Sequence, residues 1–479
     1  MPPTLDGLPE EIIIGIGICL PRDSLAKLAQ CSSQLYAACI ELLYYHCTVR
    51  NRKSLKILIN TILKKSVIGP SIRWLDLRCF DLNELSRVLL WKTTSLDLFQ
   101  KAISVQNKSS SWDIINWARG VLMDISCWAL ISVLLCLVPK LRVLGLPSLG
   151  EERTRQGIYY KGAHYEVSTF SNFIARLARD QRTESPDSAP LRVLANLESI
   201  TISPDFHHER TALDCIVPLM NLRSVKRFKV VLMWHCYWMN SRRVKCIEPI
   251  PNIESLSFIL CWFSDGIATF LGRFTGIQRF YLSGGTDIVY PFDGLHPYVD
   301  DILKGLTSSK HSLKYVDISN VCRLPDDHPS SFSQFKRLQV AKLSPSPSIW
   351  SSVSTIEDEF RLINSLPPGL RILVCKPFYD QYDFVSLEQF YELVVKKEIY
   401  VPKIRQIELI WDDANSTYDC KDCQKHCEMS EKAPFFLNLI AECKAKNICI
   451  FSGHPSRKPS RTPEPEDLEN TQGLLGNLS

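Results

Sequence analysis

The chain has 479 residues, of which 45% are hydrophobic and 22% are charged. These fractions are typical of a folded protein and exclude a wholly disordered or collagen-like chain. The 56 lysines and arginines exceed the 51 acids by only five. This small excess argues against a protein whose whole surface coats nucleic acid, but it allows a local basic patch.

No membrane segment or leader is expected. The first eleven residues contain acids and no basic region, unlike a signal or transit peptide. The most apolar run, Ile125 to Val138, is shorter than the roughly 20 residues of a membrane span. It therefore predicts a buried helix. The 18 cysteines, with no export signal, indicate reduced thiols in the cytosol or nucleus, and those with apolar neighbours are expected to behave as small hydrophobes: Cys31, Cys39, Cys136 and Cys261.

Three short helices are predicted in the first fifty residues. Pro9 suits the start of the first helix, whose apolar stripe comprises Ile12, Ile13, Ile16 and Leu20. Gly15 and Gly17 weaken this helix by roughly 1 kcal/mol each relative to alanine. Pro21 ends it, Asp23 is expected to cap the second helix, and the third begins near Ser33. Helices this short cannot bury all their apolar surface on one another. They either cap a larger domain or keep part of the stripe for a partner protein.

The order of these residues resembles an F-box. The matching positions are Leu8, Pro9, Glu11, Ile12, Leu20, Pro21, Leu25, Leu28, Ser32, Leu35, Tyr36, Leu42, Leu43 and Tyr44. The resemblance implies docking onto the Skp-type adaptor of a cullin ubiquitin ligase. Carried over to this chain, the docking face would consist of Leu8, Pro9, Ile12, Ile16, Leu20, Leu25 and Leu28.

An aliphatic triple with the spacing L-x-x-L-x-L recurs in the rest of the chain. Its ten copies are Ile72/Leu75/Leu77, Leu141/Leu144/Leu146, Leu197/Ile200/Ile202, Val225/Phe228/Val230, Ile253/Leu256/Phe258, Ile277/Phe280/Leu282, Leu313/Val316/Ile318, Leu338/Ala341/Leu343, Leu370/Leu373/Cys375 and Ile404/Ile407/Leu409. Many copies follow Pro or Gly, and helix-like stretches lie between them, so strand, turn and helix alternate.

This pattern resembles an irregular leucine-rich-repeat solenoid, in which parallel strands form the inner face and helices the outer face. It departs from that family because the Asn or Cys expected three residues after the triple occurs only as Cys261. The alternative is a generic α/β domain.

We therefore predict an α/β protein with a small all-α F-box at residues 1–50 and a repeat solenoid at residues 51–451. The polar segment 147–190, with a helix near Phe170–Arg179, is interpreted as a surface insertion. Residues 452–479 have the composition of a disordered tail.

One cysteine-rich cluster is a candidate metal site. Cys420, Cys423, His426 and Cys427 offer thiolate and imidazole ligands that suit Zn²⁺, and Cys443 is a candidate to complete the set. The alternative is a polar loop of reduced cysteines, since a structural zinc site normally has two separated ligand pairs. We expect no other cofactor.

A basic and aromatic stretch is a candidate binding surface. Arg227 and Lys229 alternate with buried positions and are expected to point to the inner face, and Trp234 and Trp238 follow. Together they would suit a phosphorylated or acidic substrate peptide, with nucleic acid less favoured. The alternative is a solvated edge with tryptophans packed between repeats.

The functional hypothesis is a substrate-recognition adaptor without catalytic residues, whose partners are the Skp-type adaptor, a cullin ligase and an unknown protein substrate. The alternative is a repeat scaffold for protein interactions with no role in a ubiquitin ligase. The sequence shows no nucleophile or phosphate-binding motif that would support an enzyme.

Overall fold

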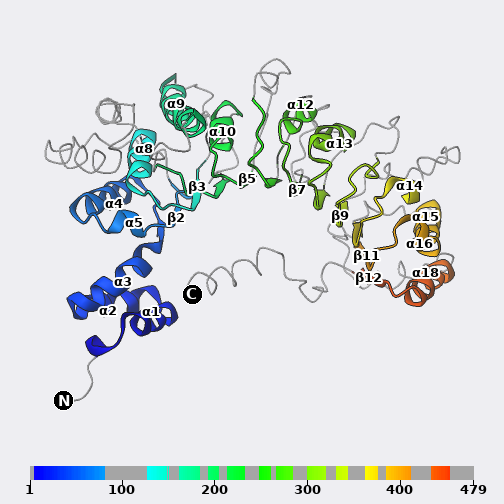
Figure 1. Ribbon diagram of the computed structural model, residues 1–479, viewed down its shortest axis with the longest axis horizontal. Coiled ribbons are helices and arrows are strands. Elements are labelled where there is room, and N and C mark those ends of the chain that lie inside the picture. Colours follow the sequence, from blue (N-terminus) through cyan, green and yellow to red (C-terminus); the bar gives the residue numbers. More distant parts are fainter. Residues whose placement is uncertain are drawn as a thin grey trace, which may run out of the picture. The chain divides into compact units, whose positions relative to one another are not determined.

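The structure is a computed structural model that describes residues 5–80, 127–147, 149, 161–183, 193–203, 213–231, 248–259, 261, 266–283, 299–319, 331–343, 362–375, 384–410 and 433–453. The described residues form an α/β protein with twelve strands, all parallel and ordered as in the chain. They divide into two compact units with a boundary between Ile277 and Gln278. Strands β1–β6 belong to the first unit and β7–β12 to the second (Figure 1).

Three short helices begin the first unit, and we refer to residues 5–45 as the helical head. A 3-10 turn at Leu5–Gly7 leads into α1 (Glu10–Cys19), α2 (Arg22–Cys31) and α3 (Ser33–Tyr45). The Ser32 hydroxyl caps α3 by accepting a hydrogen bond of 3.1 Å from the Leu35 N–H. The predicted cap at Asp23 is wrong. Pro21 takes the capping position with φ −56°, so Asp23 lies within the first turn, where its charge favours the positive helix end.

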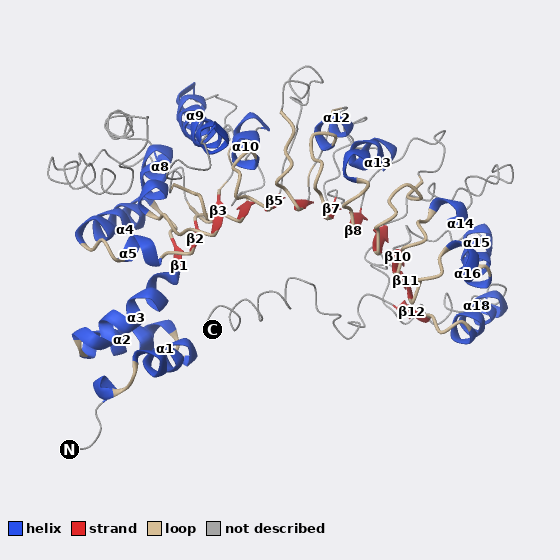
Figure 2. Cartoon of the chain, viewed as in Figure 1, coloured by secondary structure: helices blue, strands red, loops and turns tan. Residues whose placement is uncertain are grey.

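Strands and helices alternate through the rest of the first unit. The elements are β1 (His46–Thr48), α4 (Arg52–Lys64), α5 (Ile68–Ser71), β2 (Trp74–Asp76), α8 (Cys127–Leu137), β3 (Val143–Leu146), α9 (Lys161–Thr183), β4 (Ser199–Ile202), α10 (Leu213–Met220), β5 (Arg227–Val231), β6 (Ser255–Ile259) and α12 (Ile267–Leu271). Helices α8, α9 and α10 lie on the same side of the strands (Figure 2).

The second unit repeats this arrangement. Its elements are β7 (Arg279–Ser283), α13 (Val299–Leu306), the 3-10 turn η2 (Thr307–Ser309), β8 (Tyr315–Ser319), β9 (Val340–Leu343), α14 (Leu362–Ser365), β10 (Ile372–Cys375), α15 (Phe384–Val395), α16 (Lys397–Tyr400), β11 (Gln406–Ile410), α18 (Ala433–Ala445) and β12 (Cys449–Gly453).

The aliphatic triples form the core of both units. The middle residue of every predicted triple lies in a strand, and none of the triple side chains is more than 2% exposed. The residues between them are partly exposed, as in β6, β7 and β8, where partly exposed and buried positions alternate. The predicted parallel strands with intervening helices are therefore observed.

Two predicted boundaries differ from the structure. Strand β1 lies inside the segment assigned to the F-box, and it pairs with β2 through Cys47 and Leu75. Strand β12 extends to Gly453, two residues beyond the predicted end of the repeats, and pairs with β11.

The segment interpreted as a surface insertion contributes to the helical layer. Helix α9 spans 23 residues and packs against both α8 and α10. Its buried side chains include Phe170, Phe173 and Leu177. The helix predicted near Phe170–Arg179 is therefore observed as part of the longer α9, which packs between α8 and α10 and is not a surface insertion.

The apolar run predicted to be a buried helix is α8. Its described side chains are almost all buried, among them Ile131 and Leu134 at 0% exposure. None of the described helices has the length and apolar character needed to cross a bilayer. Among the described cysteines, Cys39, Cys136 and Cys261 are free thiols and are buried, as predicted. Cys31 is exposed, because it lies at the solvent-facing end of α2.

Neighbouring repeats approach closely at the turn before each strand. A Cβ atom on Gly276 would lie 2.7 Å from the Pro251 carbonyl oxygen, and one on Gly369 would lie 2.8 Å from the Lys336 carbonyl oxygen. These contacts occur at the same position of two repeats, one in each unit. Each explains why a glycine precedes the triple there, since a side chain would collide with the backbone of the preceding repeat.

Asn252 occupies the equivalent position in the repeat of β6. Its Nδ2 lies 2.7 Å from the Val225 carbonyl oxygen, 2.9 Å from that of Leu222 and 3.2 Å from that of Met220. Asn196, in the repeat of β4, donates to the Pro139 carbonyl oxygen at 3.0 Å. The amide side chains thus satisfy carbonyl groups of the preceding turn.

We predict that Asn252→Ala lowers the free energy of unfolding by about 1–3 kcal/mol, since partly buried carbonyl groups lose their donor. Asn196→Ala is the matched control. Its side chain is exposed and has one such contact, so the loss should stay below about 1 kcal/mol. Urea unfolding followed by circular dichroism measures both values. Equal losses in the two variants would contradict the role assigned to Asn252.

Candidate partner-binding site

The helical head has a small core of its own. It consists of Ile13, Leu25, Ala29, Leu35, Ala38 and Cys39, none more than 5% exposed. Gly17 allows α1 to approach this core closely, because a Cβ atom there would lie 2.7 Å from Leu42 Cδ1. Gly15 has open space around it. The two glycines of α1 therefore have different roles, although both are expected from the sequence to weaken the helix equally.

The predicted docking residues separate into exposed, intermediate and buried positions. Ile12 is 52% exposed and Pro9 is also exposed. Ile16 is half-buried, and Leu8, Leu20 and Leu28 pack partly against the core of the head. Leu25 is only 5% exposed and is a core residue, so its assignment to the docking face is corrected. It packs inward because it lies on the face of α2 that covers α1 and α3.

Two further apolar side chains of the head are exposed. Ile18 is 45% exposed and Leu5 is 42% exposed. The apolar stripe predicted on one face of α1 includes neither residue. A signal was present, because α1 is apolar on all sides and a three-helix head cannot cover every side. The surface around α1 thus presents isolated isoleucines to solvent.

The head is joined to the repeats by a polar contact and by continuous backbone. Lys65, which follows α4, donates to the Tyr36 hydroxyl of α3 at 3.1 Å, and its Nζ lies 4.6 Å from the centroid of the Tyr36 ring. Helix α3 runs directly into β1, where the His46 ring lies 5.0 Å from that of Trp74. Movement of α3 would therefore disturb the first strand of the repeats.

Burial sets the ionisation of several groups near this junction. It raises the pKa of the Cys47 thiol to about 11 and lowers the pKa of His46 below its usual value. The hydrogen bond from Lys65 to Tyr36 raises the pKa of Lys65. At neutral pH, Cys47 is therefore a neutral thiol and the Lys65 ammonium is retained.

The basic stretch is described only in part. Arg227 lies in β5, where its Nη2 is 3.9 Å from Glu198 Oε2. Lys229 is partly exposed on the same face of the strand, as predicted. Trp234 and Trp238 lie outside the described residues, so their joint surface with the basic pair stays a prediction.

The candidate zinc ligands Cys420, Cys423, His426 and Cys427 also lie outside the described residues. Cys443, the suggested additional ligand, is buried in α18, and burial raises its pKa to about 11. Within the described residues, no group of three or more His, Cys, Asp and Glu side chains could hold a metal ion.

No protein-family model matches this chain, and no curated protein is significantly similar to it. The resemblance of the head to an F-box therefore depends on its own residues and on their placement.

The two glycines of α1 allow a test of how tightly the head is packed. Gly15→Ala should stabilise α1 by about 1 kcal/mol, because alanine is the better helix former and has room there. Gly17→Ala should give less stabilisation or a loss, because its methyl group must displace Leu42. Hydrogen exchange of α1 peptides, read by mass spectrometry, should slow about fivefold only in Gly15→Ala. Equal slowing in both variants would show that α1 does not pack on α3 as described.

Proposed function

We propose that the chain is a substrate-recognition adaptor, which docks through the helical head onto a Skp-type adaptor of a cullin ubiquitin ligase and presents a protein substrate on its repeats. The observation that carries the proposal is the exposure of Pro9 and Ile12 at the start of α1, within the ordered F-box-like pattern. Exposed apolar groups cost free energy in water and gain it on binding, so their retention on a small helical module favours a protein partner.

The chain would contribute proximity rather than chemistry. Holding a substrate beside a carrier protein loaded with ubiquitin raises the effective concentration of the substrate lysines, and the adaptor needs no catalytic group for this. The repeated strands suit this role, since they offer a row of alternating, partly exposed side chains supported by a buried core.

Ile12 can be tested against a matched isoleucine. Ile12→Asp should weaken binding to a purified Skp-type adaptor at least thirtyfold, the loss expected on removing a central interface residue worth about 2 kcal/mol. Ile57→Asp is the control, because Ile57 of α4 is 56% exposed and lies outside the head. Biolayer interferometry with the full chain measures both affinities.

Circular dichroism of the two variants must show wild-type melting, since both side chains are exposed in the free chain. Absence of binding by the wild-type chain, or equal binding by Ile12→Asp and Ile57→Asp, would refute the docking proposal. The substrate can then be sought by affinity capture with the proteasome inhibited, comparing wild-type with Ile12→Asp.

A second candidate is a repeat scaffold whose head only caps the first strand. The contact of α3 with α5 and the continuity of α3 with β1 favour it. The two roles differ in how strongly the repeats depend on the head.

A truncation that begins at Tyr45 retains β1 and removes α1, α2 and most of α3. A docking module with its own core should leave the melting temperature of the repeats within a few degrees of wild-type. A cap should lower it by about 5 °C or more, because its removal uncovers apolar surface of the repeats. A thermal melt followed by circular dichroism distinguishes these outcomes.

A further inference from the structure

The residue just before each strand forms a column across neighbouring repeats, and we refer to these residues as the pre-strand column. In the first unit, its members before β3 to β6 are Arg142, Glu198, Lys226 and Glu254. Arg73, the member before β2, lies next to Arg142 and donates to the Pro70 carbonyl group. The backbones of neighbouring members are adjacent, since the Glu198 N–H donates to the Arg142 carbonyl at 2.8 Å and the Glu254 N–H donates to that of Lys226 at 2.8 Å. From Arg142 to Glu254 the charges alternate in sign, and Lys226 Nζ lies 3.4 Å from Glu254 Oε1. Arg142 Nε lies 4.0 Å from Glu198 Oε1.

The column has a different charge pattern near the end of the second unit. Arg371 and Arg405 are consecutive members, and the Arg405 N–H donates to the Arg371 carbonyl at 2.8 Å. Lys403 lies two residues before Arg405, and all three side chains are exposed. In the part of the chain that the structure describes, none of the three forms an ion pair with a carboxylate within 4.0 Å. Like charges on adjacent strands repel, so this arrangement favours a bound anion.

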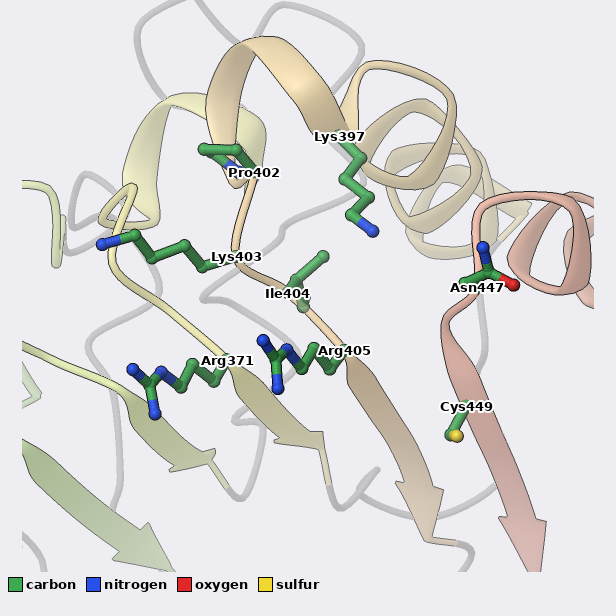
Figure 3. Close-up of a pocket in the computed structure, with 8 residues that line it drawn as sticks. All are labelled: Arg371, Lys397, Pro402, Lys403, Ile404, Arg405, Asn447 and Cys449. Carbon is green, nitrogen blue, oxygen red and sulfur yellow. The ribbon is translucent and has the colours of Figure 1, made fainter.

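The three cationic side chains belong to the lining of a pocket of about 590 Å³. The full lining consists of Arg371, Lys397, Pro402, Lys403, Ile404, Arg405, Asn447 and Cys449 (Figure 3). Figure 3 shows the Arg371 and Arg405 guanidinium groups extending in the same direction from neighbouring strands, while Lys397 reaches toward the pocket from α16.

Lys397 gives the pocket a fixed, buried cation. Its residue is 8% exposed, and its Nζ donates to the Lys446 carbonyl at the end of α18 at 3.0 Å. This bond holds the ammonium group in place and uses one of its three N–H donors. A buried ammonium with donors to spare, in the lining of the same pocket as two guanidinium groups, makes a built site for an oxyanion.

We propose that this pocket binds a phosphate monoester. A phosphate dianion offsets more of the four positive charges than a single carboxylate does, and its oxygens match the fork of an arginine side chain. The pocket is also far larger than a bare phosphate ion requires, and it falls within the usual size range for organic ligands, so there is room for the group that carries the phosphate. That the phosphate marks a presented protein segment rests on the proposed function, whereas affinity for a phosphate monoester does not.

Isothermal titration calorimetry of the full chain tests the site with defined probes. The probes are N-acetyl-O-phosphoserine amide, glucose 6-phosphate and inorganic phosphate, with N-acetylserine amide as the uncharged control. Both monoesters should bind more tightly than inorganic phosphate, and N-acetylserine amide should not bind. Tighter binding of phosphoserine than of the sugar phosphate supports a protein ligand, and the reverse order overturns that assignment. If inorganic phosphate binds as tightly as the monoesters, or no probe binds, the monoester proposal is wrong.

Arginine variants supply the structural control. Arg371→Gln with Arg405→Gln should weaken phosphoserine binding about tenfold to a hundredfold, through the loss of charge-assisted hydrogen bonds. Arg142→Gln, at the same column position but next to Glu198, should leave binding unchanged. Equal affinity in the double variant and wild-type would overturn the proposal.

Arg371→Glu separates binding from folding. It places opposite charges next to each other, as from Arg142 to Glu254 in the first unit, so the melting temperature in phosphate-free buffer should be equal to or above that of wild-type while phosphoserine binding is lost. A lowered melting temperature would contradict the repulsion inferred between the two arginines. Ile12→Asp should retain phosphoserine binding, and the double arginine variant should retain adaptor binding, so failure of one proposal is distinguishable from failure of the other.

Discussion

A short parallel strand can bury its aliphatic side chains only when another strand extends the sheet beside it and a covering segment closes the face. In the described part of this chain, the strands pair with strands of neighbouring repeats, and the rest of the structure follows from this stacking. The turn before each strand must pass close to the turn of the preceding repeat, which leaves room for no side chain at Gly276 and Gly369. At Asn252, the same position instead holds an amide that binds the preceding carbonyl groups. Cys261 acts similarly after β6, with its Sγ 3.7 Å from the Val230 carbonyl oxygen.

The same constraint explains which parts of the fold can be predicted from the sequence. Ten strands were predictable because their triples are buried and leave a clear aliphatic spacing. Strand β1 was missed because its triple is Tyr44, Cys47 and Val49, which contains only one aliphatic residue. Strand β12 is the last in the sheet, where Ile450 is only partly buried and Ser452 replaces the third aliphatic residue. Helix α9 was misassigned because its polar flanks resemble a surface segment, although stacking requires a helix to cover the strands there.

Packing constrains the surface positions less than the buried ones. Which surface charges lie side by side becomes evident only when the repeats are aligned in space. Arg142 and Arg371 occupy equivalent places about 230 residues apart, a relation fixed by the strand register. Arg142 is paired with the carboxylate of Glu198. Arg371 instead lies beside Arg405 and lines the pocket proposed to bind an anion. The basic stretch around Arg227 is the one that stands out in the sequence, because its charges are close together along the chain. The pocket combines the residues just before β10 and β11, helix α16, the turn before β12 and the first residue of β12, and this combination has no local signature.

In the head, apolar residues of similar hydrophobicity differ widely in burial. Leu25 and Ile12 belong to the same F-box-like pattern, yet one is core and the other is 52% exposed. Their separation depends on how α1 crosses the other helices, which is set by the close approach at Gly17 and not by hydrophobicity. An apolar residue becomes available to a partner only when the module is too small to cover it. The exposed isoleucines of α1 follow from this shortage of covering surface. Because α3 continues directly into β1, a shift of the head helices on partner binding would also displace the first strand of the repeats.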